Sequence, residues 1–380
     1  MTVEMNGNEN QPIRIAQIIG KMQAGGVEAV VFNYYRALDH SRFQFDIYYD
    51  SDSIATPPKD MIKMGARFIM LPPYQNMKEY VRELRRHLRE ENYSIVHSHL
   101  NTLSVIPLYA AWKEHIPVRI AHNHSVPGGN EFKRNMAKQV LRCFAKVFPT
   151  HYFACCEKTG RWLFGNRAFD SGKVFIVQNA VSFEKFQPLA SVAEKTRKKY
   201  GLEGKFVVGH SGRFTFAKNH MFLLDIFKEI LKRKPESVLL LVGDGELRFE
   251  IENGIVQKGL QGSVILTGKV RKPENYYMVM DVIALPSVFE GLPNTVIEGQ
   301  VAGVPLVVSK AVPEDALISD GCTYMDLSES PASWAEAVIK AAGKEVHLND
   351  AADNFHIESQ VHNLENKYTE ILNGLKKKSK

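Results

Sequence analysis

Two glutamates eight positions apart form the most informative pattern in the sequence. Glu290 and Glu298 bracket the turn Gly-Leu-Pro-Asn, which can start a helix, and the apolar residues 282–285 before them are typical of a buried strand. Carboxylates accept hydrogen bonds from hydroxyls, and amides at a helix N-terminus donate to phosphate. Isolated glutamates near a helix start are usually solvated, but the glycines and the strand favour a binding site. The pattern indicates a ligand with hydroxyl groups and phosphate.

A basic loop in the second half of the chain supplies the opposite charge. Residues 209–220 read Gly-His-Ser-Gly-Arg-Phe-Thr-Phe-Ala-Lys-Asn-His, so Arg213 and Lys218 follow an apolar strand and precede a helix. A guanidinium offers a fork of donors and an ammonium offers a point charge, and both suit a diphosphate. Taken alone, a basic loop is usually just solvated.

The first half of the chain contributes glycines after its first strand. Gly25 and Gly26 open a helix expected over residues 27–38. The fingerprint Gly-x-Gly-x-x-Gly is missing there, which argues against a nicotinamide cofactor. A Gly-Gly pair can also simply mark a turn of the backbone that has no binding role.

Four histidines follow two further strands of the first half: His97, His99, His122 and His124. Pairs of histidines at i,i+2 after two strands are not a recognised metal site. The plainer interpretation is a set of polar residues at strand ends that line a cleft.

The elements that must position these residues alternate between strands and helices. Apolar runs lie at 13–19, 43–49, 67–71, 95–96, 117–121, 152–155, 206–209, 237–242, 264–266, 282–285 and 305–308, and amphipathic segments such as 27–38, 77–91, 220–233 and 248–258 lie between them. This alternation predicts parallel sheets covered on both faces. We therefore expect an α/β protein of two doubly wound Rossmann-like domains that face each other across a cleft.

The first expected domain is built from two separate segments of the chain, and the second is built from one. Residues 1–188 form the N-terminal domain, which a C-terminal helix over 356–375 would complete. Residues 189–355 form the C-terminal domain, and residues 376–380 form a basic tail.

The bulk properties are those of a soluble globular protein. The chain has 380 residues, 44% hydrophobic and 24% charged, with a formal net charge of +6, a bias compatible with anionic ligands or an anionic membrane surface. The four cysteines show no metal-ligand spacing, so a reducing compartment fits best. No signal-peptide core or spanning apolar run is evident. We expect a cytoplasmic protein, with peripheral contact at the inner face of the membrane as a further hypothesis.

The motifs together resemble a known family. The Glu-x7-Glu element and the Gly-Arg-x4-Lys element are similar to those of retaining glycosyltransferases of family 4, which have the GT-B fold, and Ala-His-Asn-His-Ser at 121–125 resembles EpsF-type exopolysaccharide and capsule transferases. Weaker similarities extend from Ile13 to the last helix. Two departures are Ala180, where many relatives have Gly, and Cys156, where they have Ser.

The resemblance implies that residues 1–188 form the acceptor-side domain and that residues 189–355 form the nucleotide-sugar-binding domain. It also implies a role for each site residue. Arg213 and Lys218 would bind the donor diphosphate and replace a metal, Glu290 would hold the donor sugar, and His122 or His124 would lie beside the reacting carbon. Donor-binding residues would be Glu298, at the ribose hydroxyls, with Gly291, Leu292, Pro293, Asn294, Thr295, Gly25 and Gly26. Neither a metal nor a cofactor is expected.

The predicted function is a retaining, metal-independent glycosyltransferase of extracellular or capsular polysaccharide biosynthesis. It would move a sugar from a nucleotide-diphosphate donor, by family habit a UDP-sugar, to a saccharide or lipid-linked saccharide, with no nucleic-acid partner. The alternatives are a sugar-nucleotide epimerase of the same architecture and a non-catalytic partner subunit of a glycosyltransferase.

A basic, apolar stretch over residues 132–148 carries a separate hypothesis. Its lysines and arginines alternate with large apolar residues at helical spacing. An ordinary amphipathic helix packed on its own domain is the plain interpretation, and a helix at the surface of an anionic membrane is the alternative.

Overall fold

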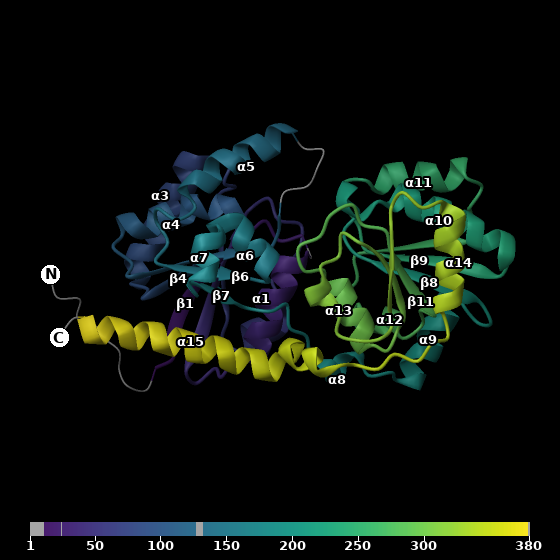
Figure 1. The fold of residues 1–380 in the computed structure, drawn as a ribbon. Helices are drawn as coiled ribbons and strands as arrows, with labels where there is room; N and C mark the ends of the chain where they lie inside the picture. The colour runs from purple at the N-terminus through teal and green to yellow at the C-terminus, as the bar shows by residue number, and fades with distance from the viewer. Residues whose placement is uncertain (1–10, 24, 127–131, 379–380) are drawn as a thin grey trace. The chain divides into compact units, whose positions relative to one another are not determined.

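A computed structural model describes residues 11–378, apart from residue 24 and residues 127–131. The chain divides into two compact units, each with a parallel sheet between helices (Figure 1). Unit 1 takes in the chain up to Ala180 and again from Ile357 onward, and unit 2 is Val181–His356.

The sheet of unit 1 has seven parallel strands in the order β3-β2-β1-β4-β5-β6-β7. Its strands are β1 (Ile13–Gly20), β2 (Phe43–Asp50), β3 (Arg67–Leu71), β4 (Ile95–Ser98), β5 (Val118–Asn123), β6 (His151–Ala154) and β7 (Val174–Ile176). The strand order reverses where β1 lies beside β4. In open α/β sheets, ligands bind beyond the carboxyl ends of the strands at such a switch point.

Helices cover both faces of this sheet. They are α1 (Gly26–Ala37), α2 (Lys59–Lys63), α3 (Met77–Glu91), α4 (Val105–Lys113), α5 (Phe132–Phe144), α6 (Glu157–Phe164), α7 (Asn166–Asp170) and α15 (Ile357–Lys378). Buried Tyr80, Leu84 and Leu88 of α3 belong to the cluster on one face. The apolar spacing of these three residues at i, i+4 and i+8 gives the helix its buried stripe.

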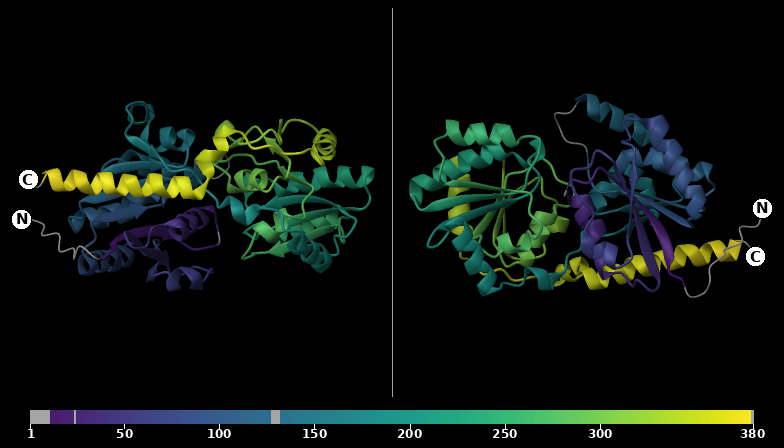
Figure 2. Two further views of the ribbon diagram at one scale, coloured as in Figure 1. Left: turned by 90° about the horizontal axis from the view of Figure 1, so that it is seen from below. Right: turned by 180° about the vertical axis from the view of Figure 1, so that it is seen from behind.

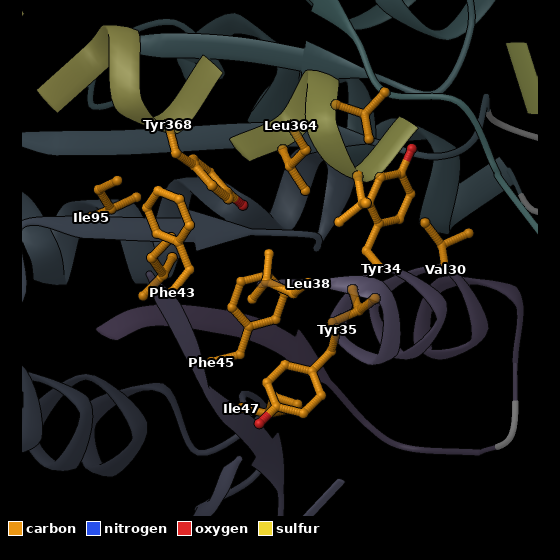
Figure 3. Packing of buried hydrophobic residues seen from close by; sticks show 14 of the residues in the cluster. Val30, Tyr34, Tyr35, Leu38, Phe43, Phe45, Ile47, Ile95, Leu364 and Tyr368 are labelled. Atoms are coloured by element: carbon orange, nitrogen blue, oxygen red, sulfur yellow. The ribbon is translucent and has the colours of Figure 1, made fainter. Parts of the chain in front are cut away.

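The last helix, α15, completes the other face of unit 1. Tyr368 and Leu364 point from it into the core that also holds Phe43 of β2 and Tyr34 of α1 (Figure 3). In both views of Figure 2 this helix, drawn in yellow, lies along the purple and blue elements of unit 1. Residues from the two ends of the chain therefore share one hydrophobic core.

Unit 2 repeats the plan with six parallel strands in the order β10-β9-β8-β11-β12-β13. Its strands are β8 (Phe206–Ser211), β9 (Ser237–Val242), β10 (Val264–Gly268), β11 (Val282–Leu285), β12 (Leu306–Ser309) and β13 (Cys322–Met325). Its helices are α8 (Phe183–Phe186), α9 (Ala190–Tyr200), α10 (His220–Arg233), α11 (Arg248–Gln257), α12 (Glu274–Tyr277), α13 (Asn294–Val301) and α14 (Pro331–Ala341). The strand order reverses between β8 and β11.

The predicted fold class of two doubly wound α/β units is confirmed. Helices α3 and α10 begin and end at the residues expected from the sequence. The sequence prediction omitted β7 and β13. The apolar strand β7 has only three residues, and β13 is half-buried with Thr323 and Tyr324 at its centre. Among the described residues, no helix combines the length and apolar character needed to cross a bilayer.

Candidate active site

Two of the predicted residues meet at the switch point of unit 2. Lys218 lies in the loop after β8, and Glu290 lies in the turn after β11, the neighbouring strand. The Lys218 ammonium nitrogen is 2.7 Å from Oε1 of Glu290, and the side chains are 15% and 10% exposed. An ion pair with so little exposure to water carries a desolvation cost. Stability alone is therefore a weak explanation for the pair, and a functional role is favoured.

Glycines shape the loop that carries these cations. The amide of Gly212 donates to the carbonyl oxygen of Val242, and the amide of Phe214 donates to that of Asp244, so the loops after β8 and β9 are bonded together. Gly243 has a φ of +142°, and a Cβ there would lie 2.0 Å from the carbonyl oxygen of Gly212. Only glycine fits this approach of two backbones.

Arg213, the other predicted cation, is in a different environment. Its guanidinium lies 3.3 Å from Oε2 of Glu246, and both side chains are about half exposed. An exposed pair of this kind contributes little to stability, so Arg213 can exchange Glu246 for a stronger anion at little cost.

The second carboxylate, Glu298, is held by a tyrosine. It lies on α13, and its Oε2 accepts a hydrogen bond of 2.7 Å from the hydroxyl of Tyr277 on α12. Burial raises the pKa of Glu298 above its ordinary value, and burial beside this carboxylate raises the pKa of Tyr277. Gly299 lets α13 pack closely on β11, because a Cβ there would lie 2.6 Å from Ile283. Tyr277 escaped the sequence prediction.

The turn between the glutamates is tied to the end of β8. The hydroxyl of Thr295 donates to the carbonyl oxygen of Ser211 over 2.6 Å. Leu292, Pro293 and Thr295 are buried, whereas Gly291 and Asn294 are half-buried. The two predicted segments of unit 2 therefore form one connected structure at the carboxyl ends of β8 and β11.

The glycines of unit 1 also lie at their predicted place, after β1. Gly25 precedes α1, which begins at Gly26. The carboxylate of Glu28 accepts hydrogen bonds from the amides of Gln23, at 2.5 Å, and Gly25, at 3.0 Å. Glu28, which the sequence prediction did not select, thus fixes the backbone of this loop from the first turn of the helix.

The four histidines of unit 1 gather beside its switch point. His122 and His124 stack with ring centroids 4.0 Å apart, and all four rings are at most 9% exposed. Burial lowers the pKa of every one of them, that of His124 to about 3, so all four are neutral at neutral pH. Nitrogens of His97, His99 and His122 lie within 4.8 Å of one another, close enough to hold a metal ion, although hydrogen bonds engage these rings.

Comparisons with known proteins agree with this geometry. The family model "Glycosyltransferase Family 4" matches residues 24–185, and the model "Glycosyl transferases group 1" matches residues 205–343. The putative glycosyltransferase EpsF of Bacillus subtilis (strain 168) is 31% identical over 337 residues, which cover 87% of this chain and 88% of EpsF. The chain belongs to glycosyltransferase family 4.

Other relatives of this glycosyltransferase extend over nearly the whole chain. The UDP-Gal:alpha-D-GlcNAc-diphosphoundecaprenol alpha-1,3-galactosyltransferase of Escherichia coli is 25% identical, covering 95% of this chain and 97% of that enzyme. Among solved structures, HepE of Anabaena in complex with UDP and glucose has a TM-score of 0.77 at 16% identity, covering 94% of this chain and 99% of HepE. The lipopolysaccharide glycosyltransferase WaaG has a TM-score of 0.67 at 13% identity, covering 92% and 94%. The last two show the GT-B fold.

One acidic pair in this glycosyltransferase was missed at the level of sequence. Asp50-Ser51-Asp52 is an Asp-x-Asp sequence directly at the end of β2. A carboxylate oxygen of Asp52 lies 2.7 Å from the ammonium of Lys21. Asp50 is buried, and its burial raises its pKa to about 6.

Proposed function

We propose that this glycosyltransferase moves a sugar from a UDP-sugar to a saccharide or lipid-linked saccharide, with retention of configuration and without a metal ion. The observation that carries the proposal is the meeting of Lys218 with Glu290 at the switch point of unit 2, with Arg213 on the same loop and Glu298 on the adjoining helix. Cations suit a diphosphate and carboxylates suit the hydroxyls of a sugar and a ribose.

The proposed roles follow from the surroundings of each group. Lys218 and Arg213 bind the diphosphate and stabilise the charge that develops on it as the sugar leaves. Transfer of Lys218 to the diphosphate releases Glu290, which then accepts hydrogen bonds from the hydroxyls of the donor sugar. Glu298, oriented by Tyr277, accepts from the ribose hydroxyls. The residues from Gly291 to Thr295 contact the sugar or phosphate, and Gly25 and Gly26 are assigned a role in binding the donor phosphate and the acceptor.

Retention is attributed to a same-face substitution. The bond between the anomeric carbon and the diphosphate oxygen breaks, and the acceptor oxygen forms its bond to that carbon from the same side. The proton of the acceptor hydroxyl passes to the departing phosphate, so charge and atoms balance. A glutamate nucleophile, as in retaining hydrolases, is disfavoured because Glu290 is assigned to the hydroxyls of the donor sugar and Glu298 accepts a hydrogen bond from Tyr277.

The names of similar proteins support the choice of donor and pathway. The relative from Escherichia coli acts with UDP-Gal, and HepE was crystallised with UDP-glucose. CapH of Staphylococcus aureus, 22% identical over 89% of this chain and 93% of its own length, is a capsular polysaccharide biosynthesis glycosyltransferase. We therefore place the reaction in extracellular or capsular polysaccharide biosynthesis.

Assays of the purified protein with a panel of UDP-sugars and saccharide acceptors test the proposal. Transfer should continue in excess EDTA, and the anomeric proton coupling of the product should match that of the donor. Glu298→Ala and Lys218→Ala should each lose most transfer while remaining folded. An inverted product, or transfer that stops in EDTA and recovers with Mg²⁺, contradicts the mechanism. Epimerisation of a donor incubated alone would favour the epimerase, and a protein inert toward every donor would favour the partner subunit.

We further propose that the acceptor is reached at an anionic membrane surface through α5 and the turn after it. Among the described side chains there, Met136, Val140, Phe144 and Val147 are 51–62% exposed and recur at helical spacing. Lysine and arginine are the only charged residues from 132 to 148. Exposed apolar residues flanked by cations suit the headgroup region of an anionic bilayer.

Vesicle flotation tests the membrane contact. The protein should float with phosphatidylglycerol vesicles and not with phosphatidylcholine vesicles, and Val140→Ser with Phe144→Ser should abolish flotation. Phe249→Ser is the matched control, because Phe249 is a 73% exposed aromatic residue on α11 of unit 2. Equal flotation by the two variants, or equal flotation with the two lipids, would refute the assignment.

A further inference from the structure

Six buried side chains of unit 1 form one continuous chain of hydrogen bonds. They come from β1, the ends of β4 and β5, and α15, and each is at most 9% exposed. In order, the bonds are His124 Nε2 to His99 Nδ1 (2.9 Å), His99 Nε2 to Gln17 Oε1 (2.8 Å), Gln17 Nε2 to Tyr368 Oη (3.2 Å), Tyr368 Oη to His97 Nδ1 (2.8 Å) and His97 Nε2 to His122 Nδ1 (3.1 Å).

The Gln17 amide at the centre determines which atom donates and which accepts in each of these hydrogen bonds. A neutral imidazole has one N–H and one lone pair, whereas an amide oxygen only accepts and an amide nitrogen only donates. Because Oε1 of Gln17 faces His99, the proton of His99 must be on Nε2. The Nδ1 of His99 then accepts, which places the proton of His124 on its Nε2 as well.

The same reasoning applies to the hydrogen bonds on the other side of Gln17. The hydroxyl oxygen of Tyr368 accepts from the amide nitrogen, so its own proton is donated to Nδ1 of His97. The proton of His97 is therefore on Nε2, from which it is donated to Nδ1 of His122. The proton of His122 must then also be on Nε2. Rotating the Gln17 amide by half a turn would reverse every bond, and a mixed set of tautomers would break at least one.

We infer that Gln17 and Tyr368 are positioning residues that fix all four histidines as Nε2–H tautomers and so prepare a binding site for one hydroxyl group. The two ends of the chain are then a donor, Nε2–H of His122, and an acceptor, the lone pair of His124 Nδ1. Neither end has a hydrogen-bond partner among the described residues. A buried polar group without a partner costs about 1–3 kcal/mol, which a suitable ligand would recover.

The chemistry of this pair selects the ligand. The rings of His122 and His124 are stacked with their centroids 4.0 Å apart, so the ring that offers the donor and the ring that offers the acceptor are neighbours at the carboxyl end of β5. A hydroxyl group donates and accepts at once and satisfies both, whereas a phosphate or carboxylate can only accept and would leave His124 opposed by a lone pair. Assigning the hydroxyl to the substrate sugar rests on the proposed function.

Nitrogen NMR of histidine-labelled protein tests the tautomers directly. Long-range proton–nitrogen correlations should identify His97, His99, His122 and His124 as Nε2–H forms, assigned through single histidine variants. Tyr368→Phe should release only His97 and His122 into a mixture, and Gln17→Leu should release all four. Tyr34→Phe is the control, because the Tyr34 hydroxyl lies in the same core but donates to the carbonyl of Gln178. A mixed set in the wild type, or a Tyr368→Phe spectrum like the control, overturns the inference.

Substrate affinity tests the hydroxyl site separately, with whichever UDP-sugar supports transfer by the wild type. If released tautomers are equally populated, Tyr368→Phe leaves His122 as a donor opposite the acceptor His124 in about half of the molecules. In Gln17→Leu one ring donates and the other accepts in about half of the molecules as well, because a hydroxyl satisfies either order. The apparent Kd should therefore rise about twofold in both variants. Unchanged Kd values with mixed tautomers refute the hydroxyl site. If no UDP-sugar supports transfer, the proposed function fails, while the NMR result still decides the tautomer assignment.

Discussion

The ion pair between Lys218 and Glu290 allows structural and chemical roles to be separated. Lys218→Met or Glu290→Gln leaves the remaining charge 10–15% exposed and without its 2.7 Å partner. Breaking a fully buried pair costs about 3–5 kcal/mol, so we expect each single variant to lose about 2–3 kcal/mol of unfolding free energy. The double variant removes both charges and should lose only about 1 kcal/mol, which gives a favourable coupling energy of about 3–5 kcal/mol.

Urea unfolding of the four proteins measures this cycle, and transfer assays on the same samples measure the chemistry. All three variants should transfer at least about 100-fold more slowly, because each lacks a charge that acts on the diphosphate or the sugar. The matched control is Lys310→Met with Asp326→Asn, an exposed pair in the same unit, whose coupling should stay below about 1 kcal/mol. A double variant that regains transfer along with stability would show that the pair only supports the fold, and a coupling no larger than the control would refute the argument from burial.

Three further predictions concern other parts of the molecule. Tyr277→Phe removes the hydrogen bond that orients Glu298, so the donor KM should rise about tenfold or more with kcat little changed; a fall in kcat alone would contradict the ribose role. Because burial raises the pKa of Asp50 to about 6, the folded protein retains a proton that the unfolded chain releases near pH 4, and stability falls as pH rises from 4 through 6. The advantage of Asp50→Asn in urea unfolding should therefore grow by about 2 kcal/mol between pH 4 and pH 7, and a pH-independent difference would refute the assignment. Gly243→Ala should lower the unfolding free energy by at least about 2 kcal/mol, because its Cβ meets a carbonyl oxygen. The control Gly201→Ala, at a φ of +61° in open space, should lower it by about 1 kcal/mol. Equal losses would contradict the predicted clash.

The sequence predicted what depends on local pattern. The apolar runs that became β8 and β11 and the loops after them follow from strand periodicity and glycine placement, and the family motif selected Lys218 and Glu290. Parallel strands bring their carboxyl ends together, so the meeting of these two residues is a consequence of the strand order. Their 2.7 Å separation required the structure.

What escaped the sequence depends on contacts between distant elements. Tyr277 ends a four-residue helix, α12, with no motif to indicate that its hydroxyl meets Glu298. The contact of Gln17 with Tyr368 joins positions 351 residues apart. Glu28 was visible as an acidic residue in the first turn of a helix, three positions after Gly25, and capping logic could have found it.

The path of the chain through unit 1 has a consequence for its synthesis. Val361, Leu364, Tyr368, Ile371 and Leu372 of α15 belong to the same core as residues of β1 and α1, yet they are translated after all of unit 2. The nascent unit 1 must therefore hold an uncovered apolar face while all of unit 2 is translated, and its native core can close only after α15 has been made. Loss of even the final two turns of α15 should destabilise unit 1, whose other elements are translated first. Unit 2 should keep its own core, because it is complete before α15 is made.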